Sequence, residues 1–189
     1  MHLLFCRHGE SDANVARVIS NRDLPHHLTV VGRRQAAALA EWLRTWAPQR
    51  VYTSPVPRAV ETAEVVSHAL DLPLEISAAL REYDCGVLEG RGDEAAWALH
   101  RALPDEWLAG KDDRRIPGGE SLNDLRARFV PFVEGLVAQY RGSDAALLCV
   151  SHGGVLSMML PLVLANVDND MVVQRGLANT VLIVSEPGP

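Results

Sequence analysis

Leu3-Leu4-Phe5-Cys6-Arg7-His8-Gly9-Glu10-Ser11 is the stretch around which the rest of the chain is organised. An apolar run of strand length ends abruptly at Arg7, so a cation and an imidazole lie where a buried strand would leave its sheet. Ligands of open α/β sheets bind at the carboxyl ends of strands, and a glycine there lets backbone N–H groups approach an anion closely. Alone, the tripeptide Arg-His-Gly is a weak signal, because a histidine at a strand end is more often structural than catalytic.

A second apolar run ends in the same way. Residues Ala145 to Val150 are continuously apolar, which predicts a central strand buried on both faces, and Ser151-His152-Gly153-Gly154 follows directly. In a parallel sheet all carboxyl ends share one edge. His8 and His152 are therefore expected to face each other if their strands are neighbours.

The segment between these runs alternates short apolar stretches with helical periodicity. Such alternation predicts a mainly parallel sheet with right-handed crossovers, so the expected fold is α/β: a three-layer αβα sandwich with a small inserted cap region. Arg58 falls near a helix N-terminus in this scheme. The expected elements are a helix capped by Thr29 and stopped by Pro48, a strand over Arg50–Thr53, a helix from Ser54-Pro55 to Leu72-Pro73, and a strand over Leu74–Ile76.

From Arg81 to Gly119 the pattern loosens and glycines interrupt it. We expect this stretch to be a cap that covers the strand ends, within one domain over residues 1–189. The loop over Ser11–His27 is expected at the same surface. Further expected elements are one or two helices around Ala95–Leu103 and Pro104–Leu108, a helix opened by a Ser121-x-x-Asp124 capping box and kinked or shortened by Pro131, and a last strand over Asn179–Ser185.

The charge of the chain limits its partners. A formal net charge of −6 argues against a nucleic-acid partner, because a duplex-binding surface needs a basic field. A small anionic ligand needs only a local pocket. Lys111 is the sole lysine, and arginine is the better bidentate partner for phosphate or carboxylate.

Cysteine usage and hydropathy suggest a cytoplasmic protein. Cys6, Cys85 and Cys149 are odd in number and widely spaced, which predicts neither a disulfide framework nor a zinc site. The first strand is expected to begin at residue 2 or 3, which leaves no room for a signal peptide, and no run reaches the roughly 18 apolar residues of a membrane span. No membrane partner is expected. A homodimer stays open.

If the two His-Gly turns meet, Arg7 and Arg58 would join them in a pocket of fixed positive charge and N–H donors. Such a pocket suits a phosphoryl group.

The chain resembles the histidine phosphatase superfamily, in the branch that includes cofactor-dependent phosphoglycerate mutases and many small phosphatases. The matching motifs, in order over residues 7 to 154, are Arg7-His8-Gly9-Glu10-Ser11-x-x-Asn14, Leu28-Thr29-x-x-Gly32-x-x-Gln35-Ala36, Ser54-Pro55-x-x-Arg58-Ala59-x-x-Thr62-Ala63, Arg81-Glu82-x-x-x-Gly86-x-x-Glu89-Gly90, Pro117-Gly118-Gly119-Glu120-Ser121 and Ser151-His152-Gly153-Gly154.

The resemblance implies a role for each matching residue. His8 would be the nucleophile that forms a phosphohistidine, for which a neutral imidazole is available near pH 7 without a metal. Arg7, Arg58 and His152 would hold the nonbridging oxygens and, with Asn14 and Gly153, bind the substrate. The general acid would be Glu82, and Asp84, two residues further on, is the rival for that role. No metal or cofactor is expected.

The function expected from the resemblance is hydrolysis of a phosphate monoester of a small metabolite. A phosphoglycerate mutase-type phosphotransferase is the alternative within the family, and a non-catalytic phospho-ligand binding protein is the alternative from another class. The resemblance implies that a mutase would have a longer insertion after the general acid, with basic residues that hold a phosphoglycerate. Here the span from Glu82 to Gly118 is short and has Arg114-Arg115 as its sole clustered basic pair, which disfavours the mutase. Structural hydrogen bonding is expected of Glu10, Ser11, Glu89 and Glu120, and no role is assigned to Arg17, Arg22, His26, His27 or Arg114-Arg115.

Overall fold

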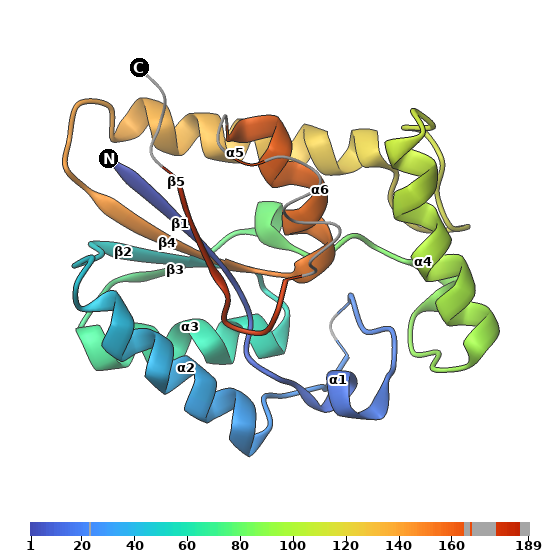
Figure 1. Ribbon diagram of the computed structural model, residues 1–189, viewed down its shortest axis with the longest axis horizontal. Helices are drawn as coiled ribbons and strands as arrows, with labels where there is room; N and C mark the ends of the chain where they lie inside the picture. The colour runs from blue at the N-terminus through green and yellow to red at the C-terminus, as the bar shows by residue number, and fades with distance from the viewer. Residues whose placement is uncertain (23, 165–166, 168–176, 186–189) are drawn as a thin grey trace.

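A five-stranded sheet of order β3-β2-β4-β1-β5 forms the centre of the computed structural model, which describes residues 1–22, 24–164, 167 and 177–185. Four strands run parallel, and the edge strand β5 runs antiparallel to β1. The sheet is thus mainly parallel, as predicted (Figure 1). The strands are β1 (His2–Arg7), β2 (Arg50–Thr53), β3 (Leu74–Ile76), β4 (Ala146–Ser151) and β5 (Leu182–Ser185).

The pairing of β1 with β4 brings the two His-Gly turns together. His2 pairs with Ala146 and Arg7 with Ser151, so the two strands end in register. The ladder extends one step beyond the strands, because the His8 N–H donates to the Ser151 carbonyl at 3.0 Å. His8 and His152 therefore leave neighbouring strands at the same edge of the sheet.

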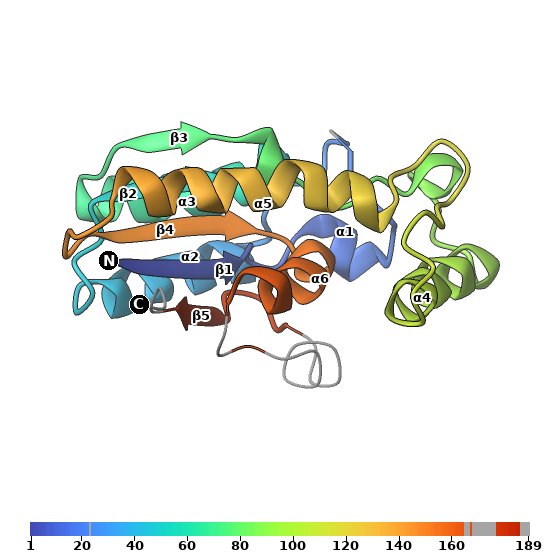
Figure 2. The same cartoon turned by 90° about the horizontal axis from the view of Figure 1, so that it is seen from above.

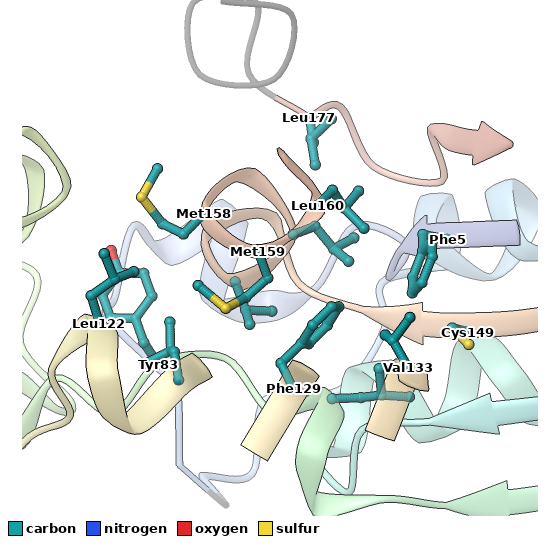
Figure 3. Packing of buried hydrophobic residues seen from close by; sticks show 14 of the residues in the cluster. Phe5, Tyr83, Leu122, Phe129, Val133, Cys149, Met158, Met159, Leu160 and Leu177 are labelled. Atoms are coloured by element: carbon teal, nitrogen blue, oxygen red, sulfur yellow. The ribbon is translucent and has the colours of Figure 1, made fainter. Parts of the chain in front are cut away.

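Helices cover both faces of the sheet, as expected for a three-layer sandwich (Figure 1). On one side lie α2 (Val30–Leu43) and α3 (Pro57–Leu70), and on the other lie α5 (Leu122–Gln139) and α6 (Gly153–Val163). Side chains of β1 alternate between the two cores: Leu4 and Cys6 pack towards α2 and α3, whereas Leu3 and Phe5 pack towards α5 and α6. Figure 3 shows Phe5 beside Phe129 of α5, their ring centroids 6.0 Å apart.

The cap lies beyond the carboxyl ends of β1 and β4 (Figures 1 and 2). It consists of the short helix α1 (Asp12–Ala16), the helix α4 (Glu94–Leu108), and irregular chain that includes 3-10 turns over Ala78–Leu80 and Gly86–Leu88. The Trp97 indole N–H donates to the Arg17 carbonyl at 2.7 Å, which ties α4 to the end of α1.

Several helices and strands begin or end at other residues than predicted. Helix α3 starts at Pro57 with Val56 as its N-cap, not at Ser54-Pro55, and the Ser54 hydroxyl accepts from the Val56 N–H at 3.3 Å just before the helix. Of the one or two helices predicted around 95–103 and 104–108, the structure has one, α4, and Pro131 does not shorten α5, since each proline removes only one N–H from a packed helix. The last strand begins at Leu182 rather than Asn179.

Other predicted signals are confirmed. Thr29 caps α2 by accepting from the Gly32 N–H, and Ser121 and Asp124 form a capping box at the start of α5. Within the described ranges, no helix is both long and apolar enough to cross a membrane.

The first turn of α2 packs backbone to backbone against the loop that follows β1. A Cβ added to Gly32 would lie 2.0 Å from the Glu10 carbonyl oxygen, and one added to Gly9 would lie 2.6 Å from the Gly32 carbonyl oxygen. Thr29 reinforces the contact, since its N–H donates to the Glu10 carbonyl at 3.0 Å. Glycine is thus required at both positions to hold the loop that carries His8.

We expect Gly32→Ala to lower the free energy of unfolding by more than about 2 kcal/mol, because neither backbone can move without displacing the other. Gly135→Ala is the matched control. Gly135 lies inside α5 with nothing within 4 Å of an added Cβ, so alanine there should stabilise the protein by about 0.5–1 kcal/mol. Urea unfolding of both variants measures the difference, and equal effects would contradict the packing argument.

Candidate active site

A pocket of about 500 Å³ opens at the carboxyl edge of the sheet, between the strand ends and the cap. Six of the seven predicted site residues line it. The seventh, His152, is fully buried and is not part of the lining; it lies behind Arg58 and contacts that guanidinium. The six lining residues are Arg7, His8, Asn14, Arg58, Glu82 and Gly153.

Arg58 holds the site together from the first turn of α3. Its side chain is buried, and its Nε donates to His8 Nε2 at 2.8 Å while its Nη2 lies 3.1 Å from His152 Nδ1. The remaining Nη1 donates to the Ser20 carbonyl at 2.6 Å. Burial lowers the pKa of Arg58 to about 10, so the guanidinium stays charged at neutral pH.

These contacts determine which ring nitrogens carry protons. A guanidinium can only donate, so His8 Nε2 and His152 Nδ1 must both be acceptors. His8 Nδ1 lies 2.7 Å from the Gly9 carbonyl and donates to it, so the lone pair of His8 is on Nε2. His152 carries its proton on Nε2, which lies 2.8 Å from the Ser54 hydroxyl.

Both imidazoles are held neutral. Burial lowers the pKa of His8 well below its ordinary value, and the charges of Arg58 and Arg7 lower it further. The pKa of His152 is lowered by burial and then by Arg58. The two rings lie close together, with centroids 5.1 Å apart.

Arg7 supplies a second positive charge next to His8. One terminal nitrogen donates to the Leu177 carbonyl, whereas the buried Nε has no hydrogen-bond partner among the described residues. A buried N–H without an acceptor is costly, and an anion in the pocket would satisfy it. A Cβ on Gly153 would lie 3.4 Å from the Arg7 side chain, so the glycine leaves room for this arginine.

Glu82 enters the pocket from the cap side and lies against the first turn of α6. Its carboxylate accepts from the N–H groups of Tyr83, Gly154 and Val155 at 3.0, 2.8 and 2.7 Å. Burial raises the pKa of Glu82, although these hydrogen bonds and Arg58 oppose the rise. A Cβ on Gly154 would lie 2.8 Å from a Glu82 oxygen, which explains the second glycine of the motif.

The neighbouring carboxylates have structural partners. Arg128 of α5 forms a two-pronged contact with Glu120 and donates to the carbonyls of Ala79 and Arg81, which fixes the chain just before Glu82. Asp84, the rival acid, pairs with Arg22 at 2.9 Å and does not line the pocket. These contacts favour Glu82 over Asp84 as the group that reaches a ligand.

Asn14 is oriented by the capping box of α1. Its Oδ1 accepts from the Ser11 N–H and hydroxyl at 3.0 and 3.1 Å, so the amide nitrogen is the end that can donate into the pocket. Glu10 and Glu89 likewise make structural hydrogen bonds, to Thr29 and to the backbone of Asn21.

The structure shows the contacts of two histidines to which the sequence analysis assigned no role. His27 pairs with Glu61, and His26 lies 2.8 Å from the Ser20 hydroxyl.

Some contributors to the site were not predicted as such. The Thr62 hydroxyl accepts from the Gly9 N–H and donates to the Arg58 carbonyl, and the Ser54 hydroxyl contacts His152 Nε2 as well as the Val56 N–H. On the cap, Trp97 and His100 line the pocket from α4. The helical spacing of Trp97, His100, Arg101 and Pro104 places them on one face and is the signal that could have identified them.

Comparisons with known proteins agree with this geometry. The sequence pattern of the histidine phosphatase superfamily (branch 1) matches residues 3–188. A probable phosphoglycerate mutase GpmB of Proteus mirabilis is 34% identical over 165 residues, which cover 87% of this chain and 75% of that protein. A glucosyl-3-phosphoglycerate phosphatase of Mycolicibacterium vanbaalenii is 31% identical over 184 residues, covering 94% and 80% of the two chains.

Solved structures give the same result. The chain superposes on a mycobacterial glucosyl-3-phosphoglycerate phosphatase with a TM-score of 0.78 at 29% identity, covering 97% of this chain and 91% of that one. The alpha-ribazole phosphatase of Shigella flexneri gives a TM-score of 0.78 at 26% identity, covering 97% and 89%. The chain belongs to the histidine phosphatase superfamily, branch 1.

Proposed function

We propose that the chain is a metal-independent phosphatase that hydrolyses phosphate monoesters of small metabolites through a phosphohistidine on His8. The observation that carries this proposal is the contact of Arg58 with both histidines, which leaves the lone pair of a neutral His8 on Nε2 inside a positively charged pocket. A neutral imidazole is a competent nucleophile, and two guanidiniums can stabilise the charge of a transferring phosphoryl group.

In the proposed first step His8 Nε2 attacks phosphorus and the bond to the leaving oxygen breaks. A protonated Glu82 gives its proton to the departing alkoxide, so the first product is an alcohol. Arg58 and Arg7 exchange their present acceptors for nonbridging oxygens, and Asn14 and the Gly153 N–H add donors. Burial supports the protonated form of Glu82, and the negative charge of a bound phosphoryl group would support it further.

In the second step water attacks phosphorus, the P–N bond breaks and Glu82 recovers its proton from that water. Inorganic phosphate leaves and neutral His8 is restored. His152 is proposed to hold Arg58 in the free enzyme. To donate to a phosphoryl oxygen it would need a proton on Nδ1, which the charge of the bound anion favours.

The phosphoglycerate mutase-type activity stays as the second candidate, because a relative with 34% identity carries that name. A mutase returns the phosphoryl group of His8 to a second hydroxyl, whereas a phosphatase releases it to water. Incubation with labelled phosphoglycerate distinguishes the two. Label recovered in inorganic phosphate supports the phosphatase, and label recovered in the isomeric phosphoglycerate supports the mutase.

A cytoplasmic location and a homodimer also stay proposals. The three cysteines are free and buried, which fits a reducing compartment. Gel filtration with light scattering measures the oligomeric state.

His8→Ala should lower kcat for an aryl phosphate by at least about a thousandfold, because it removes the imidazole whose Nε2 lies beside Arg58 in the pocket. His68→Ala is the control, since His68 is exposed near the C-terminal end of α3 and does not line the pocket. Full activity in His8→Ala would show that the proposed mechanism is wrong.

Glu82→Gln should lower kcat/KM about 10²- to 10⁴-fold for an alkyl phosphate, whose leaving group needs a proton. The loss should be much smaller for p-nitrophenyl phosphate, whose leaving group is stable as an anion. Asp84→Asn should change neither value beyond about twofold, because Asp84 lies outside the pocket lining. A large loss in Asp84→Asn together with an active Glu82→Gln would reverse the assignment of the acid.

The histidine pKa values predict how stability depends on pH. In the unfolded chain His8 and His152 take up protons below about pH 6.5, whereas in the folded protein their lowered pKa values keep them neutral. The unfolded state then binds more protons, so the contribution of these two groups to stability falls as the pH drops below 6.5. Proton NMR of the free enzyme should show the rings of His8 and His152 still neutral at pH 6. Protonation of His8 at pH 6 would contradict the assigned arrangement.

A further inference from the structure

A second hollow of about 450 Å³ lies beside the main pocket and shares part of its wall. Arg7, Trp97 and His100 line both spaces, and the second one adds Arg17 and Asn179. A ligand whose phosphoryl group contacts Arg7 in the main pocket can therefore extend into this hollow without crossing the protein interior.

The second hollow differs from the main pocket in the charges of its lining residues. Three arginines, Arg7, Arg17 and Arg101, line it, and among the described lining residues there is no carboxylate. The lining of the main pocket, in contrast, includes the carboxylates of Glu82 and Asp105. The positive charge of this lining contrasts with the formal net charge of −6 of the whole chain.

Two of these arginines are available for a ligand. Arg17 makes no ion pair with the described residues, while its backbone is fixed at the end of α1 by the Trp97 indole bound to its carbonyl. Arg101 pairs with Glu94, but their side chains are 54% and 76% exposed. A pair this exposed contributes little and can be exchanged for a better-placed anion.

The aromatic rings that line both spaces, those of Trp97 and His100, add no charge to the hollow. His100 is packed between Tyr83 and Trp97, with the Tyr83 hydroxyl 3.0 Å from its Nε2. Burial and then the charge of Arg101 lower the pKa of His100 to about 4, so the ring is neutral at physiological pH. Recognition of charge in the hollow thus rests on the arginines.

We propose that the substrate carries a second anionic group, a carboxylate or another phosphate, which binds between Arg17 and Arg101 while the scissile phosphoryl group lies against His8. The assignment rests on the proposed phosphatase activity and narrows its substrate class to phosphate monoesters of acidic alcohols. Trp97 and His100 would contact the body of the leaving group where it passes between the two spaces.

The test uses alkyl phosphates of three to six carbons whose far end is a methyl group, a carboxylate or a second phosphate. Wild-type kcat/KM should be about tenfold or more higher for an anionic series than for the methyl series at the best chain length. Arg17→Gln and Arg101→Gln should each remove most of that preference and leave the methyl series within about twofold. Arg34→Gln, an exposed arginine of α2 that lines neither space, is the charge-matched control.

The outcomes separate this proposal from the proposed function. If wild type hydrolyses all three series equally, or if Arg34→Gln removes the preference as strongly as Arg17→Gln, the second anion site is wrong while the phosphatase stands. If wild type hydrolyses none of them, p-nitrophenyl phosphate included, the proposed function itself fails. The carboxylate series and the bisphosphate series show which anion the site prefers.

Discussion

The contact of one guanidinium with two imidazoles is the interaction on which this site depends. Arg58 donates to His8 Nε2 and to His152 Nδ1, and it can only donate, so a single side chain fixes the tautomer of both rings. Burial, and then the charge of Arg58 beside them, keeps both rings neutral. Arg58 and the Gly9 carbonyl together define the direction of the His8 lone pair.

The fold brings these three groups together from distant parts of the chain. Parallel pairing of β1 and β4 in register places the two histidines at one edge, and the first turn of α3 delivers Arg58 to the same edge. Backbone contact between Gly9 and Gly32 then holds the loop after β1 against α2. The first turn of α6 holds the carboxylate of Glu82 through two backbone N–H groups. Each support is a rigid element, which suits a site that works by positioning charge.

Much of this arrangement could be predicted from the sequence. Apolar runs that stop at His-Gly indicated two strands with functional ends, and the alternation between them predicted a parallel sheet. The motifs quoted for the family also placed Arg7, Asn14, Arg58, Glu82 and Gly153 in one pocket, where the structure has them.

What could not be predicted depends on tertiary contacts. Ser54 was expected to open α3, but the helix begins at Pro57 and the Ser54 hydroxyl contacts the ring of His152, a distant partner that a local pattern does not show. His152 was expected to face the ligand directly and instead lies behind Arg58 in the free enzyme. The cap was located as residues 81–119, but its direction of packing was not, so the contributions of Trp97 and His100 emerged only with α4 in place.

In the proposed mechanism His8 reacts through Nε2, because its Nδ1 is occupied by the Gly9 carbonyl. The most direct measurement is to trap the phosphorylated enzyme by rapid mixing with a phosphate monoester and to identify which ring nitrogen carries the phosphoryl group by ¹⁵N–³¹P coupling in NMR. We expect a phosphohistidine at residue 8 bonded through Nε2. A phosphoryl group on Nδ1, or on a residue other than His8, would contradict it.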